Sequence, residues 1–204
     1  MDIKVFSELI KNRSRELDRL IRRQLPIKVG RIAKDHYQNN FRKGGFINRG
    51  LQKWPTTRRQ QSDSTSAAAS YGPLLSKRNH LFSSVKYAPG DYRVKVSNEV
   101  PYAAIHNEGG TINTHPTVTP EMRKMAWSRA YAIAGIKVKG KKKKKLPKEL
   151  PAEARKWKAL ALTKKTKLNI KATIPQRRFL GESAELSKRI NDRTEEEITK
   201  IIKL

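Results

Sequence analysis

The chain has 204 residues, and its 46 lysines and arginines against 18 aspartates and glutamates give a formal net charge of +28. This charge indicates a polyanionic neighbour, either nucleic acid or an acidic protein surface. The absence of cysteine excludes disulfides, thiolate catalysis and cysteine-based zinc sites.

Two amphipathic helices are predicted in the N-terminal part, residues 1–45. Apolar residues at helical spacing indicate a helix from about Ile3 to Gln24. Pro26 can occupy the first turn of a second helix. Its apolar stripe runs to Phe41, and the helix is expected to end at Gly44 and Gly45.

Residues 46–73 are predicted to form a long, flexible polar loop, because the run T-T-R-R-Q-Q leads into the polar, low-complexity run S-D-S-T-S-A-A-A-S. Residues 74–204 are predicted to form an α+β domain with a lysine-rich insertion at 136–150. At its start, residues 76–79 read as a short helix, and the alternating runs 85–87 and 92–96 predict a β-hairpin.

Residues 119–135 predict a helix, with Thr119 as its cap and Pro120 in its first turn. The runs 157–162 and 168–174 alternate in polarity, which predicts a second hairpin. A last helix is expected from about Glu182. Its acidic run 195–197 opposes the helix dipole, which a nearby basic surface could compensate.

The segment Val100–Gly110, V-P-Y-A-A-I-H-N-E-G-G, carries the residues that could form a reactive site. His106, Glu108 and His115 could together hold a zinc ion. The helical spacing H-E-x-x-H is absent, however, and the two glycines after Glu108 would break a helix. A metalloenzyme therefore remains only a third alternative, which metal analysis of the purified protein would decide.

The same segment is better interpreted as a structural turn. In this interpretation Tyr102 and Ile105 anchor the turn to the core, and His106 is hydrogen-bonded rather than metal-bound. The segment is expected to lie near a subunit boundary. Because neither a G-x-S-x-G elbow nor a phosphate-binding loop occurs, we expect no enzymatic activity and no cofactor.

Lysines are concentrated between the predicted helix 119–135 and residue 148. Such a block stays extended unless an anion meets it. Lysines contact phosphates without reading sequence, so DNA contact here would be nonspecific. The candidate contact residues for DNA or a partner are Lys137, Lys139, Lys141, Lys142, Lys143, Lys144, Lys145, Arg58 and Arg59.

No apolar run approaches the ~18 residues of a membrane span, and the N-terminal sequence lacks the apolar core of a signal peptide. We therefore expect a protein that is made in the cytoplasm and makes no membrane contact.

Four segments in order resemble the phage virion morphogenesis family, which contains tail-completion and neck proteins of tailed bacteriophages. They are residues 74–84, the segment 100–110, residues 118–127 and I-P-Q-R-R-F-L-G-E-S at 174–183. The family usually has Thr-Gly where this chain has Arg78-Asn79. The resemblance runs from about Leu74 to the C-terminus. The lysine run of this chain falls in an insertion that is variable in the family.

The resemblance implies a non-enzymatic virion protein with a small, mostly antiparallel sheet packed by helices. It implies a homo-oligomeric ring at the neck, bound to connector or adaptor and tail proteins and assembled in the host cytoplasm. Residues expected to fix turns or line subunit interfaces are Tyr102, His106, Glu108, Arg177, Arg178 and Phe179. The alternative is a nonspecific nucleic-acid-binding protein, such as a packaging or ribosome-associated factor.

Overall fold

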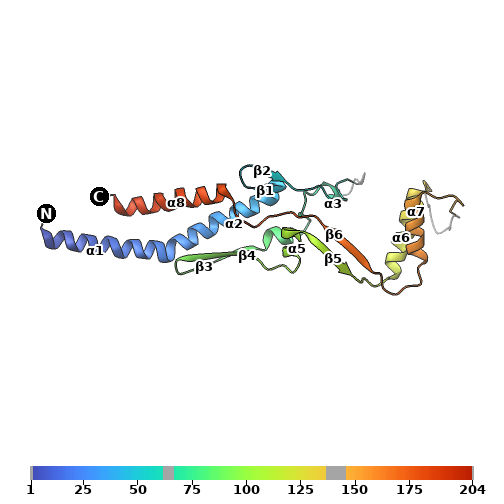
Figure 1. Cartoon of the computed structure of the whole chain (residues 1–204), viewed down its shortest axis with the longest axis horizontal. Helices are drawn as coiled ribbons and strands as arrows, with labels where there is room; N and C mark the ends of the chain where they lie inside the picture. Colours follow the sequence, from blue (N-terminus) through green and yellow to red (C-terminus); the bar gives the residue numbers. More distant parts are fainter. Residues whose placement is uncertain (1, 62–66, 137–145, 204) are drawn as a thin grey trace. The chain divides into compact units, whose positions relative to one another are not determined.

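The computed structural model describes residues 2–61, 67–136 and 146–203, and it confirms the predicted α+β class (Figure 1). The chain divides into two compact units. Unit 1 comprises residues 1–110 and 174–204, and unit 2 comprises residues 111–173. This division differs from the predicted one at 45 and 73, because the chain leaves unit 1 after Gly110 and returns at Ile174.

Unit 1 begins with helical structure that continues through Pro26. Helix α1 (Ile3–Arg19) is followed by a π-helical turn, η1 (Leu20–Gln24), and then by α2 (Leu25–Lys43). The backbone N–H of Leu25 donates to the Leu20 carbonyl, which is the wider π spacing. Pro26 lacks an N–H, so it can directly follow this turn at the start of α2.

Two antiparallel hairpins follow α2 in unit 1. Strand β1 (Gly45–Ile47) pairs with β2 (Leu51–Lys53), so the prediction of a loop throughout 46–73 is wrong at its start. Strand β3 (Val85–Gly90) pairs with β4 (Arg93–Asn98), which confirms the predicted hairpin.

Short helices occur between and after these hairpins: α3 (Ala67–Ser70), α4 (His80–Ser83) and α5 (Ala103–Glu108). The helix predicted at 76–79 is wrong. These residues form a turn in which the Asn79 side chain accepts a hydrogen bond from the Ser76 backbone at 3.1 Å. The segment 100–110, predicted as a turn, contains α5.

Unit 2 is a helix pair with a strand pair. Helix α6 (Pro120–Ile133) begins at the predicted cap, since the Thr119 side chain accepts a hydrogen bond from the Met122 N–H. Helix α7 (Ala152–Leu162) packs against α6. Strand β5 (Gly110–Thr114) pairs with β6 (Ile170–Ile174). The predicted hairpin of 157–162 with 168–174 is therefore wrong, because 157–162 is helical.

The packing of α7 explains why the strand prediction for 157–162 is wrong. Its buried residues are Ala154 and Ala161, seven positions apart and so on one helical face, and the buried residues of α6 are Ala126 and Ala130. Four small side chains allow the two helices to pack closely. The window 157–162 is apolar except for Lys158, so its own pattern does not distinguish a helix from a strand, and packing against the partner helix decides between the two.

Helix α8 (Ala184–Ile202) returns the chain to unit 1 and confirms the predicted last helix. Ser183 caps it by accepting a hydrogen bond from the Leu186 N–H at 3.2 Å. In the parts of the chain that the structure describes, no helix is both long and apolar enough to cross a membrane.

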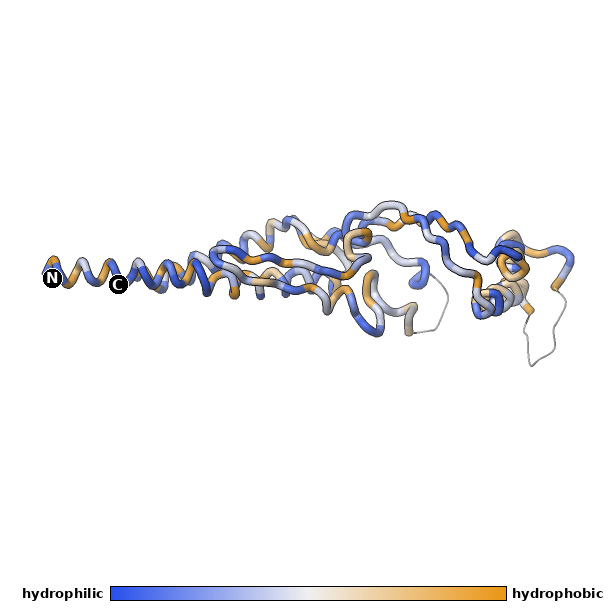
Figure 2. The backbone as a smooth tube through the Cα atoms, turned by 90° about the horizontal axis from the view of Figure 1, so that it is seen from below, coloured by the Kyte–Doolittle hydropathy of each residue, from blue (hydrophilic) through white to orange (hydrophobic). Residues whose placement is uncertain are grey.

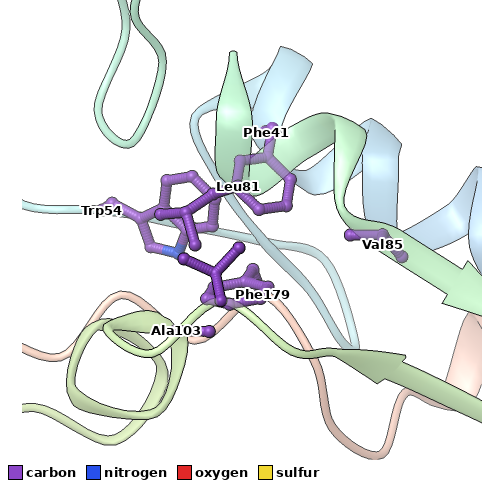
Figure 3. Close-up of a cluster of buried hydrophobic side chains, with 7 residues drawn as sticks. Phe41, Trp54, Leu81, Val85, Ala103 and Phe179 are labelled. Atoms are coloured by element: carbon purple, nitrogen blue, oxygen red, sulfur yellow. The ribbon is translucent and has the colours of Figure 1, made fainter. Parts of the chain in front are cut away.

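The main core of unit 1 lies where α2, β3, α5 and the segment before α8 meet (Figure 3). Phe41 and Phe179 are completely buried there, with ring centroids 5.0 Å apart, and the Trp54 ring meets Phe41 edge-on. Gly30 brings α2 onto the hairpin, since a Cβ at this position would lie 2.3 Å from the Tyr87 ring.

A smaller core joins the first and last helices. It contains Leu20, Leu25 and Ile201. Next to it, buried Glu197 of α8 accepts from Lys28 Nζ at 2.6 Å and pairs with Arg193 at 2.7 Å. These cations provide the compensation that an acidic residue in the second half of a helix needs.

Phe179→Ala would leave a cavity in the main core, because the ring is fully buried between Phe41 and its neighbours. We expect it to lower the free energy of unfolding by about 3–5 kcal/mol, measured by denaturant titration. Phe179→Leu keeps most of the apolar volume and serves as the control. An equal loss in both variants would contradict a role based on packing.

Glu197→Gln would remove a carboxylate whose pKa is held below its usual value, first by the hydrogen bond from Lys28. The folded-state pKa is depressed, so this stabilisation is complete above the ordinary carboxyl pKa of 4.5 and is lost as the pH falls below it. We therefore expect Glu197→Gln to lower the melting temperature at pH 7 and to reduce the loss of stability on acidification.

The exposed neighbour Glu195 provides the control, because it makes no ion pair among the described residues. Glu195→Gln is expected to leave both the melting temperature and its acid dependence nearly unchanged. Equal behaviour of the two variants would show that the contact with Lys28 does not stabilise the fold.

Candidate interaction surfaces

The segment 100–110 and the segment 174–183 meet in unit 1. The backbone N–H of Arg177 donates to the His106 carbonyl at 2.8 Å. The side-chain oxygen of Asn107 accepts from the N–H groups of Phe179 and Leu180 at 2.8 and 2.9 Å. A glycine is required beside this contact, because a Cβ on Gly109 would lie 2.8 Å from the backbone nitrogen of Gln176.

Other side chains bind the carbonyls of the same segment. Trp54 Nε1 donates to the Arg178 carbonyl at 2.8 Å, and the Asn40 amide donates to that of Phe179 at 3.1 Å. The Tyr37 hydroxyl donates to the Gly181 carbonyl at 2.9 Å. Residues 177–181 are thus held by side chains from several elements, and we call them the clamped segment.

Arg177, Arg178 and Phe179, which were expected to fix turns or line subunit interfaces, belong to the clamped segment. Arg177 and Phe179 are buried in unit 1, whereas Arg178 is exposed. Arg177 is only 6% exposed, and its Nε and Nη2 donate to the Pro55 carbonyl at 3.1 and 3.0 Å. Burial, and then the charge of Arg59, lowers the pKa of Arg177. The Arg178 guanidinium lies over the Phe46 ring, 5.7 Å from its centroid.

Sequence reasoning missed Asn40 and Asn107, which satisfy backbone groups of the clamped segment. Asn40 is fully buried, and its side-chain oxygen also accepts from the Ile47 N–H. No feature of the sequence marks it, since asparagine in a helix is normally exposed. Asn107 lies in the segment 100–110, which resembles the family. Its place in that motif was the feature of the sequence that could have identified it.

His106 is hydrogen-bonded through its backbone, because its carbonyl accepts from the Arg177 N–H. Its buried Nδ1 has no hydrogen-bond partner among the described residues. Burial, and secondly the charge of Arg177, lowers the pKa of His106. The imidazole is therefore neutral at pH 7.

Tyr102 differs from expectation, whereas a role of Glu108 in fixing a turn or lining a subunit interface stays a prediction. Tyr102 does not anchor the segment in the core, since it is 45% exposed and meets the edge of the His106 ring. Glu108 is exposed and accepts a hydrogen bond from the Asn107 amide.

The three residues considered for a metal site are not one cluster. His106 and Glu108 belong to unit 1, whereas His115 belongs to unit 2 and bonds through Nδ1 to the Asn169 side chain at 2.8 Å. Within residues 2–61, 67–136 and 146–203, no group of three or more histidine, aspartate or glutamate side chains could hold a metal ion.

The predicted DNA or partner contacts have separate outcomes. Arg59 Nη2 donates to the carbonyls of Gly72 and Leu75 at 2.7 and 2.6 Å and so holds residues 72–75, which follow it in the chain. Its contact with DNA or a partner stays a prediction. Arg58 is exposed. Residues 137–145, which hold the candidate lysines, lie outside the described residues.

Helix α1 presents an apolar stripe that is not covered. None of the residues of α1 is buried, and the first buried residue along the described chain is Leu20, directly after the helix. Before Leu17, the side chains of Ile3, Phe6 and Ile10 are 83%, 52% and 51% exposed. Figure 2 shows apolar positions recurring along this helix among polar ones. Exposed apolar side chains at helical spacing are the kind of surface from which interaction sites are built.

The family comparison covers nearly the whole chain. The model of the phage virion morphogenesis family matches residues 6–199, which include most of α1, all of unit 2 and most of α8. No significant match is found among the curated proteins or among the solved structures. The chain therefore belongs to the phage virion morphogenesis family, and its role lies in building a bacteriophage virion.

Proposed function

We propose that this protein is a neck or tail-completion component, which joins the capsid connector to the tail. In this proposal it acts as a non-enzymatic structural subunit and binds the adjacent connector and tail proteins. Family membership supports a role in the virion, and the order of the four motif segments supports the narrower assignment. The protein would be assembled in the host cytoplasm and remain in the virion.

The uncovered stripe of α1 carries the proposal of a homo-oligomer. A helical stretch as short as residues 3–16 is only marginally stable alone in water, and most helical stability in proteins comes from packing an apolar face. The stripe of Ile3, Phe6 and Ile10 continues, at helical spacing, the face that packs on α8 through Leu17 and Leu20. A second subunit would complete this packing.

A ring requires each subunit to use two different surfaces, since head-to-tail contacts close into a ring when the rotation allows it. The stripe of α1 supplies one of these surfaces. That the segment Tyr102–Gly110 lies near a subunit boundary stays a prediction, and the exposed Tyr102 ring is the group available for that contact.

Replacing Ile3, Phe6 and Ile10 together by serine would remove the stripe without touching the core, because none of the three is buried. We expect the wild-type protein to be oligomeric and this variant to be monomeric by light scattering after gel filtration. Helicity by circular dichroism is expected to fall slightly, since the free end of α1 loses its packing partner.

Ile27→Ser is the matched control, because Ile27 is similarly exposed (51%) but lies on α2. It should remain oligomeric. If the wild-type protein is monomeric at all concentrations tested, or if the triple variant assembles like the wild type, α1 does not form the subunit contact.

The neck role itself is tested on particles. We expect that virions produced without this protein appear in electron micrographs as separate filled heads and finished tails, and that supplying the protein in an extract restores joined particles. Tails that stay attached in its absence would contradict the role in joining. Missing or unfinished heads would instead place the protein earlier in assembly.

A further inference from the structure

The positive charge of the chain is distributed unequally between the two units. Unit 2 contains 18 lysines and arginines and 3 acidic residues, whereas the more than twofold longer unit 1 contains 28 and 15. Nearly all compensating carboxylates therefore belong to unit 1. The excess in unit 2 does not come from the predicted lysine block alone, since 11 of its 18 cations lie among the described residues.

The type of cation also differs between the units. Arginine supplies 16 of the 28 cations of unit 1 but only 3 of the 18 of unit 2. Several arginines of unit 1 hold the fold. Arg22 and Arg23 both pair with Asp91, and Arg193 pairs with Glu197. Some basic residues of unit 1 thus form ion pairs within the unit.

The described cations of unit 2 form no ion pair with the described acidic residues. All ion pairs found among the described residues lie in unit 1. Helices α6 and α7 bury alanines, so their long basic side chains lie outside that contact. The exposed described cations of unit 2 are Lys124, Arg129, Lys148, Arg155, Lys156, Lys164, Lys165, Lys167 and Lys171.

We propose that the exposed lysines and arginines of the described part of unit 2 bind the phosphate backbone of duplex DNA, independently of base sequence. Lysine is a point charge that contacts phosphates without demanding a fixed geometry, and many such contacts add up. This inference goes beyond the proposed joining function and does not depend on it.

Two observations favour duplex DNA over other polyanions. Lysine is depleted in protein–protein interfaces and arginine is enriched, so the lysine-rich composition of unit 2 fits an acidic protein partner poorly. Single-stranded nucleic acid is bound by stacking bases on free aromatic rings. The aromatic residues of unit 2 are half-buried, and the rings of Trp127 and Tyr131 stack on each other along α6.

The test measures binding of the full-length protein to two fluorescent duplexes of unrelated sequence, over a range of salt concentrations. The test variant carries Lys164→Gln, Lys165→Gln and Lys167→Gln in unit 2. The control carries Lys53→Gln, Lys86→Gln and Lys95→Gln in unit 1. All six lysines are exposed, and both variants lose three charges.

We expect the wild-type protein to bind both duplexes equally, with an affinity that falls steeply with salt. Each lost phosphate contact reduces the magnitude of the slope of log K against log salt by about 0.9. The slope of the unit 2 variant should therefore be smaller than that of the wild type by up to about 2.7. The control variant should keep the wild-type slope. Circular dichroism melting shows whether both variants remain folded.

If the two variants lose DNA affinity and salt slope equally, the assignment of the DNA contact to unit 2 is wrong. Absence of duplex binding by the wild-type protein, or tighter binding of single strands, would overturn duplex DNA as the ligand. Tighter binding of poly-glutamate than of DNA would assign the surface to an acidic protein instead. The oligomeric state and the joining of particles are separate measurements, so either proposal can fail alone.

Discussion

The clamped segment, residues 177–181, is an extended piece of backbone that the described structure places in no strand, yet it enters the core. Its N–H and carbonyl groups cannot remain unpaired there without a large cost. Side chains supply the partners: Asn107 from α5, Asn40 and Tyr37 from α2, and Trp54 from the residue after β2. The arrangement of these elements in unit 1 depends on these hydrogen bonds, because each element contributes a side-chain donor or acceptor to the clamped segment.

The same segment explains why residues that resembled functional ones are structural. Phe179 must be buried for its neighbours to reach these side chains, and Arg177 can be buried only because the Pro55 carbonyl accepts from two of its nitrogens. His106 lies next to Arg177, where burial and positive charge both favour the neutral imidazole. A constellation that suggested reactivity in the sequence is thus a means of joining two distant parts of the chain.

Surface features divide differently between the units. In unit 1 the outstanding feature is the exposed apolar side of α1, and part of its charge is paired, as in the contacts of Glu197 with Lys28 and Arg193. In unit 2 the outstanding feature is the excess of lysine and arginine over acidic residues. A protein that assembles through one unit and meets DNA through the other would suit a site in the virion through which the genome passes.

The sequence by itself determined the features that depend on neighbours along the chain. These are the N-terminal helices, the β3–β4 hairpin, the Thr119 cap and the α8 stripe. It also identified the family, through four short motifs, of which 100–110 and 174–183 contact each other in unit 1. Only the tertiary structure decided that 157–162 is a helix, since alanine faces on α6 and α7 select it over a strand. The partners of the clamped segment were equally hidden, because Asn40 and Arg177 are polar residues that can be buried only when groups distant in sequence complete their hydrogen bonds.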